Sequence, residues 1–141
     1  MSIVITSAAS AALRFAPIYP DWILDGEPVS HNTLLAVSRD KTARVMAWEC
    51  TPGFFNWYYT EDETVYIIYG EVFITENGIE RRLSKGDMAF FPAGCTCTWR
   101  VTEMVRKIAF LRKDLPPPCG LGVRVWNKLL RKAGIRRDSP L

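Results

Sequence analysis

One carboxylate, Glu63, lies in a segment whose neighbours could place it inside a small-molecule site. In an extended strand, residues of one parity face the same side. If Glu63 points inward, Phe55, Trp57 and Tyr59 point inward with it. A site of this kind is mostly apolar, with a few polar groups that orient the ligand. The chemistry available is proton transfer at Glu63, with Tyr59 assisting as a second catalytic group.

A second segment, residues 86–100, adds thiols and an indole to the same interior. Cys95, Cys97 and Trp99 alternate along a predicted strand and therefore share one face. The site then combines an aromatic wall, one carboxylate and two thiols. The predicted ligand-binding residues are Phe55, Trp57, Tyr59, Glu63, Cys97, Trp99 and Lys107.

The burial of Glu63 requires a partner, because an unpaired buried carboxylate is costly. The candidate donors are the Tyr59 hydroxyl, the indole N–H of Trp57 or Trp99, and the ammonium of Lys107. Without a donor, Glu63 would act as a proton donor or acceptor. Two structural alternatives stay open: Glu63 anchors a loop or a neighbouring strand, and the tryptophans fill the core.

The cysteines favour packed thiols over a metal site. The sequence contains four of them, without the spacing of a secreted disulfide framework: Cys50, Cys95, Cys97 and Cys119. Structural zinc sites pair cysteines at a wider spacing than C-x-C and use four ligands. An atypical metal at Glu63 and Cys97 is the alternative, although it would mix hard and soft donors without imidazole. No cofactor is expected.

The charge of the 141-residue chain is concentrated at its C-terminal end. Residues 1–111 contain ten Lys or Arg and thirteen Asp or Glu, a net charge of −3, whereas residues 112–141 contain eight and two, a net charge of +6. Because the basic excess is confined to the tail, no nucleic acid is expected as a partner. No apolar run reaches the roughly 20 residues of a membrane span, and no signal peptide is evident, so we expect a cytoplasmic protein.

Residues 33–112 predict a succession of short strands separated by turns. Runs of β-branched and aromatic residues recur there, and Asn77-Gly78 suits a two-residue hairpin. This spacing predicts an all-β antiparallel sandwich or barrel. The expected regions are an N-terminal extension at 1–32 with an edge or exchanged strand at residues 3–5, the barrel at 33–112, and a proline-rich linker with a helical tail at 113–141.

The tail predicts a basic amphipathic helix from Gly122 to Gly134. Apolar residues recur there at helical spacing, with Arg and Lys between them. Such a helix either docks on its own barrel or a partner subunit, or lies on an anionic membrane surface or nucleic acid. Docking is favoured over membrane contact, because most amphipathic helices in soluble proteins cover a core.

Two glycine-framed segments resemble the two sequence motifs of the cupin family. In residues 53–70, Glu63 lies seven residues before the last glycine; in residues 86–100, Pro92 and Gly94 form a P-x-G. The chain is similar to small single-domain cupins of the ureidoglycine aminohydrolase cupin-domain and EutQ-like group. This resemblance implies a cupin barrel, which is a double-stranded β-helix or jelly roll, and a homodimer joined through the N-terminal strand.

The metal-ligand positions are where the chain departs from that family. Where the first motif has its metal-ligand histidines, this chain has Trp57 and Tyr59, or Asn56 and Tyr58 if the spacer before Glu63 is four residues long instead of three. Cys97 occupies the histidine position of the second motif. The resemblance implies a manganese centre with histidine ligands for true ureidoglycine aminohydrolases, and His31, the only histidine, lies ahead of both motifs. The chain is therefore placed in the subset of the group that lacks metal-ligand histidines.

Three functions remain for such an interior. The favoured one is metal-independent binding of a planar or sugar-like small molecule in an aromatic pocket. The second is an isomerase, lyase or hydrolase with Glu63 as acid or base and Tyr59 or Cys97 assisting. The third is an atypical metal cupin. The motifs contain no nucleophile–histidine pair and no second carboxylate at a catalytic spacing, which favours binding.

Overall fold

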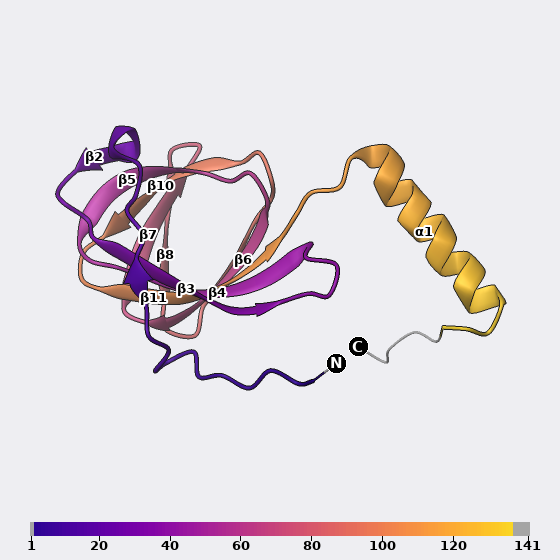
Figure 1. Ribbon diagram of the computed structural model, residues 1–141. Helices are drawn as coiled ribbons and strands as arrows, with labels where there is room; N and C mark the ends of the chain where they lie inside the picture. The colour runs from indigo at the N-terminus through magenta and orange to yellow at the C-terminus, as the bar shows by residue number, and fades with distance from the viewer. Residues whose placement is uncertain (1, 137–141) are drawn as a thin grey trace.

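The chain folds into two antiparallel sheets that enclose a core, followed by one helix (Figure 1). The computed structural model describes residues 2–136. The elements are β1 (Arg14–Phe15), the 3-10 helix η1 (Pro20–Trp22), β2 (Ile23–Asp25), β3 (Ser30–Val37), β4 (Ala43–Cys50), β5 (Gly53–Tyr58), β6 (Asp62–Tyr69), β7 (Glu71–Glu76), β8 (Ile79–Ser84), β9 (Met88–Phe91), β10 (Thr96–Val101), β11 (Val105–Arg112) and α1 (Pro117–Lys132).

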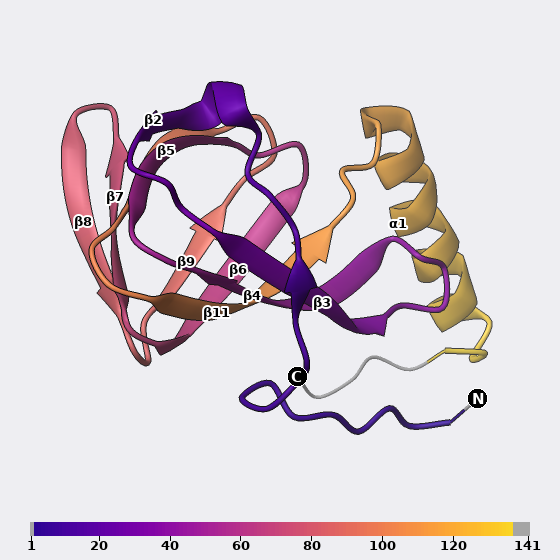
Figure 2. The same ribbon diagram turned by 60° about the vertical axis from the view of Figure 1, so that its left-hand side comes forward.

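The strand pairing is nested about a central hairpin. One sheet has the order β1-β3-β4-β11-β6-β9 and the other β2-β5-β10-β7-β8. Within them β4 pairs with β11, β5 with β10, β6 with β9 and β7 with β8. This is the pattern of a long hairpin folded into a jelly roll, and the two views of Figures 1 and 2 show the sheets wrapping around one interior. The all-β barrel predicted from the sequence is confirmed.

Two turns show why glycine recurs at the strand ends. Asn77 and Gly78 have φ of 52° and 76°, as a two-residue hairpin requires, so the predicted β7–β8 turn is confirmed. Gly70 has φ of 72°, and a Cβ there would collide with the carbonyl oxygen of Met104. Only glycine fits at position 70 without a shift of the backbone.

The core lies between the sheets and is formed by alternate residues of each strand. The largest fully buried side chains include Trp99, Phe55, Ile67, Val65 and Val72. They belong to one cluster with aromatic residues of β4, β9 and β10. Burial of every second side chain is the expected result of strands with one face on a core.

The N-terminal region crosses the mouth of the barrel. Residues 3–5 form no strand in the described chain; the short strand β1 pairs instead with His31 and Asn32 of β3. The Ala16 amide donates to the Ser30 carbonyl at 2.9 Å, and the Ser30 hydroxyl donates to the Ala16 carbonyl. Residues 16–22, which we call the strap, then lie over the opening before β2 joins β5.

The C-terminal helix begins earlier than the pattern indicated. The predicted start at Gly122 is wrong, because α1 starts at Pro117; proline is tolerated in a first helical turn, where its missing N–H is not needed. The predicted end at Gly134 is confirmed. The amides of Gly134 and Ile135 donate to the carbonyls of Arg131 and Leu130, which is a Schellman cap. Among residues 2–136, no helix is long and apolar enough to span a bilayer.

Candidate functional site

A buried ion pair lies at the centre of the barrel. Glu63 of β6 and Lys107 of β11 point inward from neighbouring strands, and Nζ donates to Oε1 at 2.7 Å. Their side chains are 8% and 3% exposed. Of the four donors proposed for Glu63, the structure uses the ammonium. The pair satisfies two charges that would each be strongly destabilising alone.

Three tryptophans surround the ammonium of Lys107. Its Nζ lies 4.5 Å from the ring centroid of Trp99, 4.9 Å from Trp48 and 5.7 Å from Trp57. The rings come from β10, β4 and β5, so both sheets contribute to this cage. A cation over an aromatic face is attracted to the ring quadrupole, more strongly where water is excluded. The cage therefore holds a fixed positive charge inside the barrel.

Tyr59 lies buried beside this cage. Trp99 Nε1 donates to its hydroxyl at 3.1 Å, and its ring stacks on Phe91 with centroids 4.5 Å apart. Burial, and next the negative charge of Glu63, raise the pKa of Tyr59 well above its usual value. The phenol therefore stays protonated and can act only as a neutral donor or acceptor at ordinary pH.

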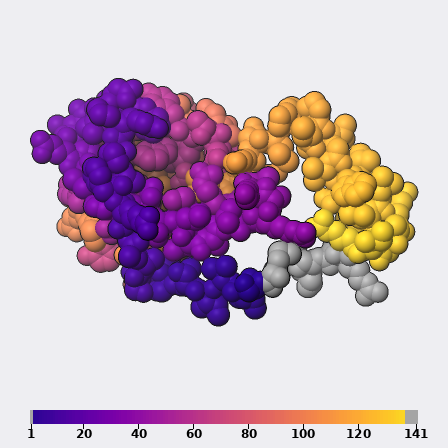
Figure 3. Space-filling view, in the orientation of Figure 1, coloured from indigo at the N-terminus to yellow at the C-terminus, as the bar shows by residue number. Residues whose placement is uncertain are grey.

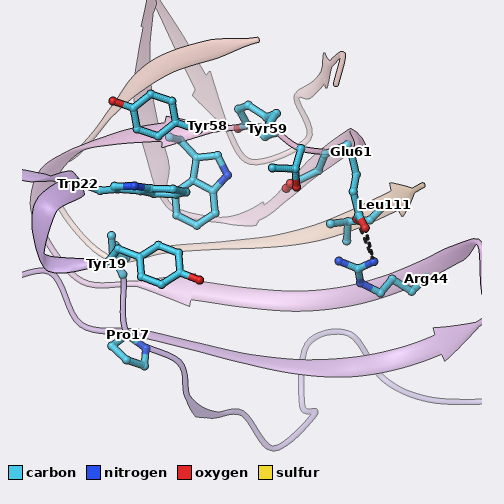
Figure 4. A pocket seen from close by; sticks show the side chains of 12 residues that line it. Pro17, Tyr19, Trp22, Arg44, Tyr58, Tyr59, Glu61 and Leu111 are labelled. Atoms are coloured by element: carbon cyan, nitrogen blue, oxygen red, sulfur yellow. Dashed lines mark hydrogen bonds and ion pairs between the residues drawn. The ribbon is translucent and has the colours of Figure 1, made fainter. Parts of the chain in front are cut away.

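A cavity of about 320 Å³ opens beneath the strap and reaches Glu63 (Figure 4). Its lining residues are Pro17, Ile18, Tyr19, Trp22, Arg44, Trp57, Tyr58, Tyr59, Thr60, Glu61, Glu63 and Leu111. One wall is aromatic, because Trp22 contacts Trp57 and Tyr58 edge-on at 5.4 and 5.0 Å between centroids. The other side carries charge from Arg44 and Glu61.

The charged side of the cavity has a carboxylate oxygen that accepts no hydrogen bond from the part of the chain that the structure describes. Arg44 Nη1 lies 2.9 Å from each carboxylate oxygen of Glu61 and forms a hydrogen bond with Oε1. Oε2 is buried and has no hydrogen bond among the described residues. Buried acceptors are almost always satisfied, so this ion-paired oxygen has unused capacity to accept a hydrogen bond.

A second cavity, of about 250 Å³, adjoins the first and is also lined by the strap. Lys107, Trp48 and Met46 line it together with Glu63, and the strap residue Ile18 lines both cavities. Ile18 is almost fully buried and packs in the core cluster. The strap thus lines both cavities, and both cavities reach Glu63 of the ion pair.

The family model of the EutQ-like cupin domain matches residues 37–109 of this chain, about half of its length. The chain belongs to the EutQ-like cupin family. This confirms the cupin assignment made from the two glycine-framed segments, and the nested sheets are the cupin jelly roll. A comparison with curated protein sequences gives no match.

Solved structures with the same fold include several cupins. The EutQ protein of Clostridium difficile is 23% identical, with a TM-score of 0.54; the match covers 60% of this chain and 63% of EutQ. A DUF861-family protein of unknown function from Pseudomonas syringae is 27% identical, with a TM-score of 0.67, and the match covers 72% of this chain and 45% of the Pseudomonas chain. The cupin domain of Cnp3 from Schizosaccharomyces pombe is 14% identical, with a TM-score of 0.61, and the match covers 80% of this chain and 71% of that domain's chain.

The residues expected to share this cupin's interior fall into three places. Trp57, Tyr59 and Glu63 line the cavity under the strap, and Lys107 lines the second one. Phe55 and Trp99 are fully buried and belong to the core rather than to the walls of these two cavities. Cys97 and Cys95 line a separate cavity of about 300 Å³ beside the β7–β8 hairpin. The thiols and the carboxylate therefore line different cavities, although Cys97 lies near Tyr59 and Trp99.

The donor set does not fit the metal centre that the resemblance implied. Among residues 2–136 no group of three or more His, Cys, Asp and Glu could hold a metal ion. Glu63 is occupied by Lys107, and burial raises the pKa of the Cys97 thiol to about 11, which opposes the thiolate that a metal needs. His31 lies on β3 opposite Glu49. We therefore derive no chemistry through a metal.

The lining residues missed by reasoning from the sequence include Trp22, Arg44, Trp48 and Glu61. For Glu61 a signal was present, because it precedes Glu63 by two residues and has the same parity. Trp48 has the inward parity of its strand. Trp22 had no local signal, since only the folding of the strap over the barrel mouth brings it to the site.

Proposed function

We propose that this cupin binds a small planar or sugar-like molecule in the cavity beneath the strap, without a metal ion. The observation that carries the proposal is Glu61 Oε2, a buried, ion-paired oxygen that accepts no hydrogen bond within residues 2–136, opposite an aromatic wall. A buried acceptor gains most from a ligand that brings a hydroxyl or N–H group. A cavity of about 320 Å³ suits a single ring with a few substituents.

The walls suggest how such a ring is held. Trp22 and Trp57 offer aromatic surface to a flat face or to the C–H face of a sugar. Across the cavity, the Arg44–Glu61 pair offers both a cation and an oxygen, Oε2, that accepts no hydrogen bond from the described chain. At the bottom, Glu63 is neutralised by Lys107 and contributes polarity rather than net charge.

The alternative is an isomerase, lyase or hydrolase in which Glu63 transfers a proton and Tyr59 assists. Two carboxylates, Glu61 and Glu63, line the cavity, which supplies the second group that the sequence motifs had not indicated. Each carboxylate is ion-paired, however, with Arg44 or Lys107. A general base must be free to take its proton, so the pairing supports binding over catalysis.

The test is saturation-transfer NMR on the purified chain with monosaccharides, sugar acids and purine bases as probes. We expect a ring compound rich in hydroxyl or N–H donors to bind, and Glu61→Gln to weaken it about tenfold or more, the usual worth of a hydrogen bond to a charged group. Trp22→Ala should also weaken binding. Glu80→Gln and Trp126→Ala make the same changes outside the cavity and should bind like the wild type.

Two outcomes would refute the proposal. If Glu61→Gln and Trp22→Ala bind the probe as tightly as their controls, the ligand lies elsewhere. If the bound probe is converted to a product and Glu63→Gln abolishes this conversion, the acid–base alternative replaces the binding function.

A further inference from the structure

Helix α1 leaves a wide apolar face without a partner. None of its sixteen residues, 117–132, is buried, and Figures 1 and 2 show it standing apart from both sheets at the end of a short linker. In the space-filling view it forms a separate lobe (Figure 3). An isolated helix of this length is marginal in water, so we expect a surface that covers it.

The two faces of the helix are sharply separated. At about 100° per residue, one side contains only apolar and small residues: Pro118, Cys119, Gly122, Val123, Val125, Trp126, Leu129, Leu130 and Ala133. Trp126 lies near the middle of that side and is 62% exposed, and Leu129 beside it is 55% exposed. The opposite side contains Arg124, Lys128, Arg131 and Lys132, with Leu121 among them.

The sign of the charges identifies the kind of surface. Residues 115–136 include no Asp or Glu, so every charge on the helix is positive. A helix face that only meets water normally mixes both signs. A uniformly basic face beside an apolar face with a tryptophan is the pattern of helices that lie in the plane of an anionic lipid surface.

The barrel itself offers a poorer match. An apolar groove of about 560 Å³ on its outer face is lined by Val37, Phe90 and Phe110 and has one acid, Asp62. That carboxylate already lies 3.9 Å from Arg112. A second copy that docked through this groove would therefore cover the apolar face of α1 without a free acidic group for its cations, whereas anionic headgroups would meet them.

We propose that α1 is a peripheral membrane anchor that lies on anionic lipid. Its apolar side enters the boundary between headgroups and acyl chains, and its basic side meets the phosphates. Pro116 restricts the connection from β11, and Pro117 and Pro118 restrict the first turn of the helix, which stands away from its own barrel (Figure 1). The anchor brings the ligand-binding barrel to the lipid surface without crossing it.

The experiment is vesicle flotation of the full chain with phosphatidylcholine vesicles, with and without phosphatidylglycerol, at low and at physiological salt. We expect binding only to the anionic vesicles, weakened by salt. Lys128→Glu should lower the partition coefficient about fivefold or more, since each cation near the surface contributes about this factor. Leu129→Glu should abolish flotation. Neither side chain is buried, so both variants should keep the wild-type circular dichroism spectrum.

Matched controls make the same changes away from the helix. Lys85→Glu, in the turn before β9, and Ile79→Glu, at an exposed position of β8, should float like the wild type. The proposal is overturned if the intact chain does not float with anionic vesicles, or if Leu129→Glu floats undiminished. It is also overturned if Leu129→Glu instead dissociates a dimer in light scattering, or if α1 binds duplex nucleic acid and not vesicles.

Discussion

The two members of the Glu63–Lys107 pair should be strongly coupled, so that changing both costs less than the sum of changing each alone. Lys107→Met leaves the Glu63 carboxylate in a site where its side chain is 8% exposed, which should cost about 3–5 kcal/mol. Glu63→Gln keeps an amide oxygen near Nζ and leaves the ammonium inside its three tryptophans. We therefore expect a smaller cost of about 1–3 kcal/mol for that variant.

The double variant Glu63→Gln/Lys107→Met should be less destabilised than the sum of the single variants by about 2 kcal/mol, because it buries no charge. The assay is urea unfolding followed by far-ultraviolet circular dichroism at one protein concentration, since fluorescence would report the altered tryptophan cage directly. As a control, the same changes at the exposed Arg100–Glu80 pair should cost less than about 1 kcal/mol.

Three results would contradict this reasoning: additive single-variant costs, a Glu63→Gln variant that is less stable than Lys107→Met, or a Lys107→Met variant close to the wild type. Any of them would mean that water or another donor reaches the carboxylate. The role of the ion pair at the bottom of the ligand cavity would then have to be revised.

Two further predictions concern the barrel. Gly70→Ala should prevent stable folding or cost several times more than Gly78→Ala in urea unfolding. Both positions have positive φ, but only a Cβ at Gly70 collides with Met104. Gly78→Ala should cost about 1–2 kcal/mol, and equal costs for the two variants would show that the backbone at Gly70 relaxes. Burial raises the pKa of the Cys50 thiol from 9.0 to about 12, so between these values the unfolded chain binds fewer protons than the folded one and stability should fall as pH rises. Cys50→Ala should reduce this alkaline slope by about one proton; an unchanged slope in pH-dependent urea unfolding would refute the assignment.

The sequence alone determined the barrel, because the causes of its strands are local. β-Branched and aromatic runs, the Asn77-Gly78 turn and the spacing of the motif glycines each act within a few residues. The succession of short strands predicted between residues 33 and 112 corresponds to β3–β11. The inward parity of Trp57, Tyr59 and Glu63 followed from the same local rule.

Only the tertiary structure decided which of these residues meet. Lys107 lies 44 positions from Glu63, and the nested pairing of β11 with β6 brings them within 2.7 Å. The strap, which closes the cavity and supplies Trp22, has no periodic pattern because Pro17 and Pro20 interrupt it, and it is held by packing and by its bonds to Ser30. Pairing at a distance depends on the free energy of the whole fold, which no short stretch of sequence contains.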